Sequence, residues 1–123
     1  MIVELNTQTK EIKDGKVEKK PGKFKADLDM SLASQTRFEA KFPAMAERED
    51  IYGYSKRICE IKENSASVLI SKMKMLYCWF DTDITFVEFL KLFDLTDEEY
   101  VKRLAKEMHD IFNLILESSA EKN

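Results

Sequence analysis

The feature that most constrains the fold of this chain is the stretch from Ser31 to Ile61, where a proline separates two amphipathic helical patterns. Ser31 is a residue type that caps helices, and it predicts a first helix that runs to about Lys41. Pro43 ends that helix, because the residue before a proline avoids helical geometry. Acidic residues within 47–50 favour the start of a second helix, since negative charge is stabilised at a helix N-terminus. The stretch therefore predicts helix, stop and helix.

Three further helical patterns follow this stretch. Residues 65–80 carry an apolar stripe at helical spacing. Thr85 and Glu88 match a capping box, in which each side chain bonds the other residue's backbone N–H at a helix start. Thr96 and Glu99 match a second capping box, which predicts the start of the last helix.

The N-terminal 30 residues have strand patterns instead. The clearest strand is 24–30, where apolar and polar residues alternate. The Asp14-Gly15 pair predicts a hairpin turn, because both residue types tolerate positive φ, and Pro21-Gly22 predicts a second turn. We expect an antiparallel sheet of two to four strands. The hairpin carrying Ile12 and Val17 has little other apolar material, so we expect it to be mobile or to be ordered by a partner.

Together these patterns predict an α+β protein that is mainly α. A small N-terminal antiparallel β segment at 1–30 precedes a bundle of about five helices at 31–117 and a polar tail at 118–123. The chain has 123 residues, which suits one domain overall and can bury a core without disulfides or metals.

Charge, hydropathy and cysteine usage indicate which partners and compartment to expect. The net charge of −3 gives no reason to expect a nucleic-acid partner. Residues 1–25 nevertheless hold seven lysines against four acids, which form either a basic contact arm or a solvated hairpin whose lysines discourage aggregation. No apolar run approaches the roughly 20 residues of a membrane helix. Cys59 and Cys78 are isolated, as in reduced cytosolic proteins. We therefore expect a cytoplasmic protein with no membrane partner.

No sequence pattern indicates catalysis. His109 is the only histidine, and no HxxxH, HExxH or CxxC motif accompanies it to complete a metal site. The acidic cluster at 47–50 lies at a helix start, where the helix dipole accounts for it. We therefore expect a protein that is not an enzyme and has no catalytic residue, no metal and no cofactor.

The aromatic residues have two open interpretations. The chain has eight Phe, four Tyr and one Trp, and those after residue 76 do not all fit one core face easily. An exposed aromatic patch marks a partner-binding groove or a self-association face, whereas a buried one fills the core. The residues assigned to the candidate groove are Tyr77, Trp79, Phe80, Phe86, Phe89 and Phe93. Both interpretations stay open for each of them.

Two segments of the chain resemble a known protein family. The first contains FEAKFP at 38–43, followed by an acidic step and an aromatic helix in EDIYGY at 49–54. The second contains LYCWF at 76–80 and TFVEFLKLFDLTDEEYVKRL at 85–104. Over residues 24–115 the chain resembles the tail assembly chaperones of long-tailed (siphovirus-type) phages and prophages of Gram-positive bacteria.

The resemblance implies a function in phage tail morphogenesis. Such chaperones bind the tape measure protein, a long helical and apolar chain, and keep it soluble until tail tube subunits polymerise around it. They also contact the tail tube protein and self-associate into oligomers. They act in the host cytoplasm and are absent from the mature virion. The resemblance transfers no individual functional residue to this chain.

Two other functions compete with this one. A small helical adaptor would bind one specific partner at a fixed stoichiometry, without a general holding activity. A nucleic-acid-binding regulator would use the lysine-rich hairpin as its contact, but the acidic remainder of the chain opposes that function.

Overall fold

The computed structural model describes residues 1–121, with side chains described up to Ser118. These residues form an N-terminal antiparallel sheet and several helices, so the fold is α+β and mainly α, as predicted. Helix α6 continues past Ser118 to Glu121, so the predicted polar tail begins as helix, and residues 122 and 123 lie outside the described part. The elements in chain order are β1 (Ile2–Lys13), β2 (Lys16–Leu28), α1 (Leu32–Lys41), α2 (Pro43–Ala46), α3 (Ile51–Cys59), α4 (Ala66–Trp79), β3 (Phe80–Asp81), α5 (Phe86–Leu90) and α6 (Glu98–Glu121).

Strands β1 and β2 form one long hairpin that is paired from end to end. Its turn is the predicted Asp14-Gly15 pair, whose φ angles of 53° and 75° are both positive, as a type I′ turn requires. The second predicted turn, at Pro21-Gly22, is wrong, because both residues lie inside β2. Pro21 is tolerated there because its partner Gln8 directs its N–H away from β2, to the carbonyl of Leu92 at 3.1 Å. At such a pair the ladder requires no N–H from the proline.

The third strand is short and directly follows a helix. Helix α4 ends at Trp79, and Phe80–Asp81 then pairs antiparallel with Asp27–Leu28 of β2. The backbone N–H of Asp29 donates to the carbonyl of Trp79 at 2.8 Å, which holds the end of α4 against the sheet. The helical pattern predicted up to residue 80 is therefore one residue too long.

Three predicted helix starts are confirmed by side-chain caps. The Ser31 hydroxyl accepts a backbone N–H of α1 at 3.2 Å. The Asp50 carboxylate accepts the N–H of Gly53 at 2.8 Å and caps α3. Thr85 and Glu88 form the reciprocal capping box of α5. Local sequence signals therefore set the N-termini of these helices.

The start of α6 differs from the prediction by one residue. The Thr96 hydroxyl donates to the carboxylate of Asp94 at 2.6 Å and caps no helix. Asp97 accepts the backbone N–H groups of Glu99 and Tyr100, at 3.2 and 3.4 Å. The predicted capping box of Thr96 and Glu99 is therefore wrong. Aspartate is at least as effective an N-cap as threonine, and its charge adds a favourable interaction with the helix dipole.

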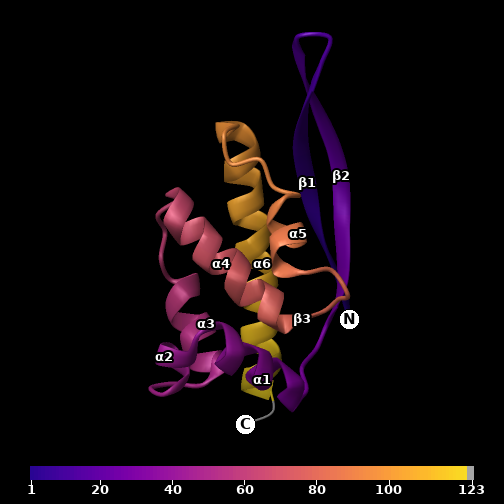
Figure 1. Cartoon of the computed structure of the whole chain (residues 1–123). Coiled ribbons are helices and arrows are strands. Elements are labelled where there is room, and N and C mark those ends of the chain that lie inside the picture. Colours follow the sequence, from indigo (N-terminus) through magenta and orange to yellow (C-terminus); the bar gives the residue numbers. More distant parts are fainter. Residues whose placement is uncertain (122–123) are drawn as a thin grey trace.

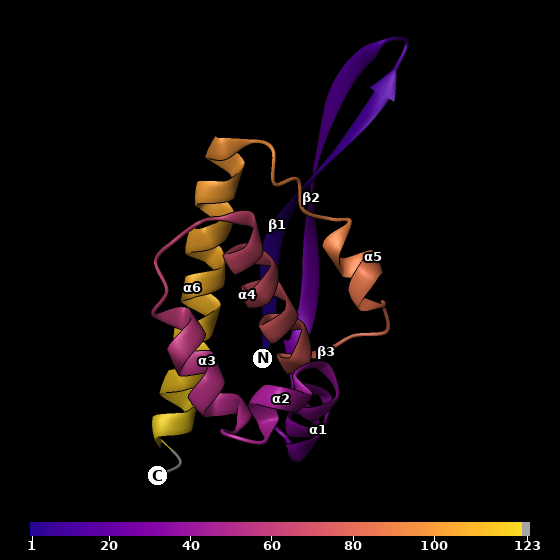
Figure 2. The ribbon, with the colours of Figure 1, turned by 60° about the vertical axis from the view of Figure 1, so that its left-hand side comes forward.

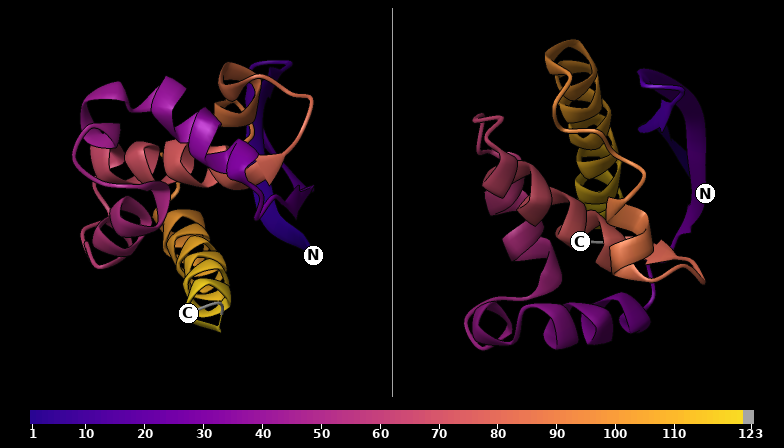
Figure 3. Two further views of the ribbon diagram at one scale, coloured as in Figure 1. Left: turned by 90° about the horizontal axis from the view of Figure 1, so that it is seen from below. Right: turned by 45° about the horizontal axis from the view of Figure 1, so that its top comes forward.

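Residues 1–121 contain six helices, but a bundle of about five helices is not confirmed. Helix α2 has four residues and α5 has five, so neither is long enough to span the protein. Helices α4 and α6 lie beside the hairpin and α3 packs against both, while α1 crosses the end of the molecule opposite the hairpin turn (Figures 1, 2 and 3). Within the described residues, no helix combines the length and apolar character needed to cross a membrane.

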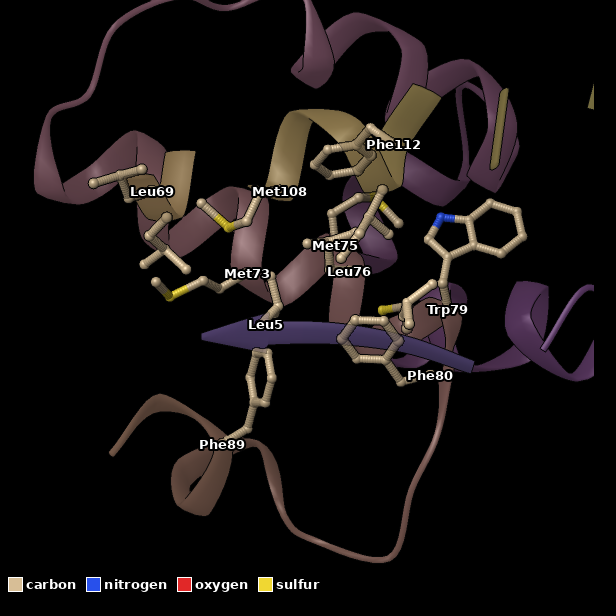
Figure 4. Close-up of a cluster of buried hydrophobic side chains, with 14 of the residues drawn as sticks. Leu5, Leu69, Met73, Met75, Leu76, Trp79, Phe80, Phe89, Met108 and Phe112 are labelled. Atoms are coloured by element: carbon tan, nitrogen blue, oxygen red, sulfur yellow. The ribbon is translucent and has the colours of Figure 1, made fainter. Parts of the chain in front are cut away.

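One buried apolar cluster joins the hairpin to the helices. Leu5 of β1 points toward the apolar side chains of α4 and α6, and Phe89 of α5 approaches the same sheet (Figure 4). The buried apolar side chains that the hairpin contributes are Val3, Leu5, Phe24 and Ala26. Because they share a core with the helices, the half of the hairpin nearest the chain terminus is a structural part of the helical body.

The outer edge of β1 is hydrogen-bonded to α6. Glu107 accepts both the backbone N–H of Asn6, at 2.7 Å, and its side-chain amide, at 3.0 Å. The Tyr100 hydroxyl donates to the backbone carbonyl of Asn6 at 2.6 Å. These bonds satisfy backbone groups that an edge strand otherwise leaves unpaired. They also fix how α6 lies along β1.

We expect the two halves of the hairpin to contribute very differently to stability. Leu5→Ala should lower the free energy of unfolding by about 2–5 kcal/mol, because it leaves a cavity in the shared core. Replacing residues 10–19 by Asn-Gly should cost less, about 1–2 kcal/mol, because the removed residues are exposed and only one of their ion-pair partners, Asp94, has a buried side chain. Urea unfolding followed by far-UV circular dichroism measures both. Equal losses would show that the whole hairpin supports the core.

Candidate functional site

The structure places most of the predicted groove residues in the core. Four are buried, namely Trp79, Phe80, Phe89 and Phe93. Tyr77 and Phe86 are only partly buried. In this conformation a partner can therefore reach two of the six side chains, and these two do not form a groove with the other four.

Trp79 is held inside the protein by a polar bond as well as by packing. Its side chain is fully buried, and its indole N–H donates to the hydroxyl of Ser55, also fully buried, at 3.0 Å. The ring of Tyr52 packs against it with 4.9 Å between ring centroids. Buried Trp usually needs a hydrogen-bond acceptor, and Ser55 provides one from α3. Trp79 therefore joins α3 to α4.

Phe89 is the centre of an aromatic cluster that attaches α5 to the sheet. Its ring centroid lies 5.1 Å from that of Phe24 and 5.9 Å from that of Phe80, both in edge-to-face geometry. Phe93 packs against it at 4.9 Å, also edge to face. Such pairs add about 0.5–1.5 kcal/mol beyond burial of apolar area. The short helix α5 is therefore fixed to β2 by Phe89, although it has little helical length of its own.

The surface that remains from the predicted groove is a small patch on α4 and α5. Tyr77 and Phe86 pack together with 5.4 Å between ring centroids, and Val87, the residue after Phe86, is exposed. The Lys41 ammonium lies 5.7 and 5.5 Å from the centroids of the two rings. We refer to Tyr77, Phe86 and Val87 as the Tyr77 patch. It offers a modest apolar surface with a cation at its rim.

Two strongly exposed apolar residues lie at the tip of the hairpin. All residues from 10 to 20 are exposed, and this segment, here termed the arm, projects beyond the helices (Figures 1 and 2). Ile12 and Val17 are cross-strand partners and are 82% and 62% exposed. Directly paired β-branched side chains present one continuous apolar face. The arm therefore carries an apolar contact outside the core of its own chain.

Ion pairs at the base of the arm connect it to the segment before α6. Lys10 lies 3.3 Å from the carboxylate of Asp94, and Lys19 lies 2.8 Å from that of Asp97. The Gln8 side-chain amide donates to both carboxylates, at 3.3 Å to Asp94 and 2.9 Å to Asp97. We refer to these five residues as the clamp. It sets the direction of the arm while leaving the tip free.

The clamp shifts the titration of its own charged groups. Hydrogen bonds from the Lys19 ammonium, the Gln8 amide and the backbone N–H of Tyr100 hold the pKa of Asp97 well below its usual range. The same ion pair raises the pKa of Lys19. For Asp94, burial favours the protonated form, but the hydrogen bonds it accepts outweigh burial and lower its pKa. Both carboxylates are therefore ionised throughout the neutral range.

A third apolar surface lies between α3 and α4. Tyr54, Ile58, Ile61 and Val68 line a shallow cleft of about 190 Å³, and Ile61 is exposed there. The Arg57 guanidinium covers the ring of Tyr54, with 5.2 Å between its central carbon and the ring centroid. The cleft can accept an apolar side chain from another molecule, with a cation beside it.

The fold also assembles one pair of reactive side chains that sequence reasoning missed. Cys59 Sγ of α3 lies 3.4 Å from Nδ1 of His109 on α6. Burial raises the pKa of the Cys59 thiol, so the neutral thiol is its form at neutral pH. No short motif connects the two residues, so only their apolar helical stripes could have suggested that α3 and α6 pack together. Among residues with described side chains, no group of three or more His, Cys, Asp or Glu is placed to hold a metal ion.

No protein-family model, curated protein or solved structure matches this chain. The function proposed below therefore depends on the described geometry and on the resemblance over residues 24–115. The geometry consists of three apolar surfaces: the arm tip, the Tyr77 patch and the cleft between α3 and α4.

We expect Trp79→Ala to lower the free energy of unfolding by about 3–5 kcal/mol, because it leaves a large cavity and an unpaired Ser55 hydroxyl. Tyr77→Ala should cost much less, because Tyr77 is only partly buried. Urea unfolding followed by far-UV circular dichroism measures both values. A Trp79→Ala protein as stable as the wild type would contradict the placement of Trp79 in the core.

We expect the arm to loosen in acid. Because the folded-state pKa values of Asp94 and Asp97 are lowered, the clamp stabilises the arm above the ordinary carboxyl pKa of about 4 and stops doing so as pH falls through the lowered values. Backbone ¹⁵N relaxation of residues 10–20 should therefore show growing motion below about pH 4. Asp97→Asn keeps a capping side chain but removes the charge, so its arm should move at pH 7. An Asp97→Asn arm as rigid as the wild type would contradict the clamp.

Proposed function

We propose that this chain is a phage tail assembly chaperone, which binds the tape measure protein and keeps it soluble while the tail tube assembles. The resemblance over residues 24–115 supports this function. In the same proposal the chain contacts the tail tube protein, acts in the host cytoplasm and is absent from the mature virion. Tube subunits would displace it as they polymerise around the tape measure protein.

The observation that carries the proposal is the arm. From Lys10 to the turn at Asp14 it extends about 13 Å past its clamp, at roughly 3.3 Å per residue. The Ile12–Val17 pair at its tip is exposed and lies outside the core of its own chain. A projecting hairpin with an apolar tip suits insertion against another molecule, and a second copy of this chain is the occupant that an oligomeric chaperone requires.

Self-association through the arm would explain how a small protein covers a long substrate. The cleft between α3 and α4 and the Tyr77 patch are each small, so one copy would bind an apolar helix weakly. Copies linked through their arms would present these surfaces repeatedly, and the effective concentration of the later contacts would raise the total affinity. Weak contacts at each site also permit stepwise displacement by tube subunits.

The free edge of β2 is a less suitable surface for self-association. Within the described residues, β3 covers this edge only at Asp27–Leu28, so residues 16–26 are unpaired on that side. Pro21 lies in this segment and offers no N–H to an added strand. The exposed lysines Lys23 and Lys25 further oppose strand addition. We therefore assign self-association to the arm tip and not to the edge.

Co-expression with a phage tape measure protein tests the function. We expect the tape measure protein to be soluble only in the presence of this chain and to elute with it, with an oligomeric mass by light scattering. Ile12→Ser with Val17→Ser should reduce the oligomeric mass and the soluble fraction of tape measure protein, because the apolar tip is removed. Leu32→Ser is the matched control, since Leu32 is 86% exposed on α1, away from the arm.

Two outcomes would count against the proposal in different ways. A tape measure protein that aggregates regardless and never co-purifies would overturn the chaperone function and favour a small helical adaptor with one specific partner. Full activity of the Ile12→Ser, Val17→Ser variant would retain the chaperone function but exclude the arm tip as its means of self-association.

A further inference from the structure

A lysine-rich groove lies between α3, the loop that follows it and α6. Its volume is about 640 Å³, which is within the range of sites for small molecules. The loop residues Ile61 and Asn64 and the α6 residue Asn113 contribute to its walls. The charged residues that line it are Lys56, Lys62, Lys72, Lys102, Lys106 and Glu60. Five lysines and one glutamate thus line the groove, although the whole chain has a net charge of −3.

Lys72 is the buried member of this set. Only 7% of its surface is exposed, and its ammonium donates to the backbone carbonyl of Ile61 at 2.6 Å. Among residues with described side chains, no carboxylate lies within ion-pair distance of Lys72, so its remaining N–H groups have no anionic partner. Burial lowers the pKa of Lys72, which reflects the cost of an uncompensated charge. A bound anion would remove that cost.

The exposed lysines of the set lie on both sides of the groove. Lys102 and Lys106 are one turn apart on α6, so their side chains leave the same helix face. Lys56 stands opposite them on α3. The Cys59 thiol and His109 lie between the two helices, where their 3.4 Å contact forms part of the same wall. Lysines from two helices and a buried lysine from a third therefore line one groove.

We propose that this groove binds a small molecule with several negatively charged oxygens, as in a phosphate ester or a polycarboxylate. The buried Lys72 would contact one anionic group, and the paired ammonium groups of α6 would contact another. The size of the groove favours a small ligand over a single inorganic ion. The groove shares Ile61 with the cleft between α3 and α4, but none of its lysines lines that cleft.

A structural role accounts for only part of this arrangement. Ile61 follows the C-terminal end of α3, so the Lys72 ammonium also caps the negative end of that helix. That role needs neither Lys106 nor Lys102, whose ammonium lies 4.0 Å from the exposed carboxylate of Glu99 outside the groove. The two explanations therefore predict different effects for substitutions on α6.

Titration with pyrophosphate and with citrate, at constant ionic strength maintained with sodium chloride, tests the site by calorimetry. We expect saturable binding of at least one of the two, a rise in the unfolding midpoint and slower alkylation of Cys59 by iodoacetamide. Cys78, which is fully buried in α4, should label no differently with or without the anion. Binding of pyrophosphate alone indicates a phosphate ligand, and binding of citrate alone indicates a polycarboxylate.

Matched lysine variants distinguish anion binding in the groove from a general attraction of anions to surface lysines. Lys102→Gln with Lys106→Gln should lower the affinity about tenfold or more, because two charge-assisted hydrogen bonds are lost. Lys13→Gln with Lys16→Gln on the arm removes the same charge and should leave the affinity unchanged. The proposal is overturned if neither anion binds saturably, or if both double variants reduce binding equally. Chaperone activity that persists in the α6 variant would leave the proposed function intact.

Discussion

The structure depends first on the burial of the proximal half of the hairpin. Leu5 and Phe24 from its two strands enter the same apolar cluster as α4 and α6, so the sheet cannot be separated from the helices without opening the core. The polar edge of β1 is satisfied at Asn6 by Glu107 and Tyr100 of α6. Packing and hydrogen bonding therefore hold α6 in the same position against β1. That position places the base of the arm and one wall of the lysine-rich groove.

The distal half of the same hairpin is exposed instead of buried. Beyond Thr9 its side chains are exposed, and ion pairs of Lys10 and Lys19 with the segment before α6 hold it in place. Surface ion pairs contribute little to stability but can fix a direction. The arm thus presents Ile12 and Val17 at a distance from the body without being part of the core. The proposed chaperone function requires this combination, because its contacts would have to form and then be released.

Much of the secondary structure could be predicted because its signals are local. The helix caps bond backbone groups within a few residues, as Ser31, Asp50 and the Thr85–Glu88 box show. The hairpin turn is equally local, because Asp14 and Gly15 adopt the positive φ angles that it requires. The prediction at Pro21-Gly22 was wrong for the opposite reason. Whether a proline interrupts a strand depends on which way its missing N–H would point, and here the bond between Gln8 and Leu92 shows that it points away from the ladder.

The sequence by itself determined the starts of α1, α3 and α5 and the hairpin turn, because each depends on neighbouring residues. It could not divide the aromatic residues between core and surface, since helical spacing shows that they share a face but not what covers that face. Only the tertiary structure buried Trp79 and Phe89. Tertiary packing also brought Lys72, Cys59 and His109 to one groove, because they lie on three helices whose mutual positions follow from the shared core and not from any local bond.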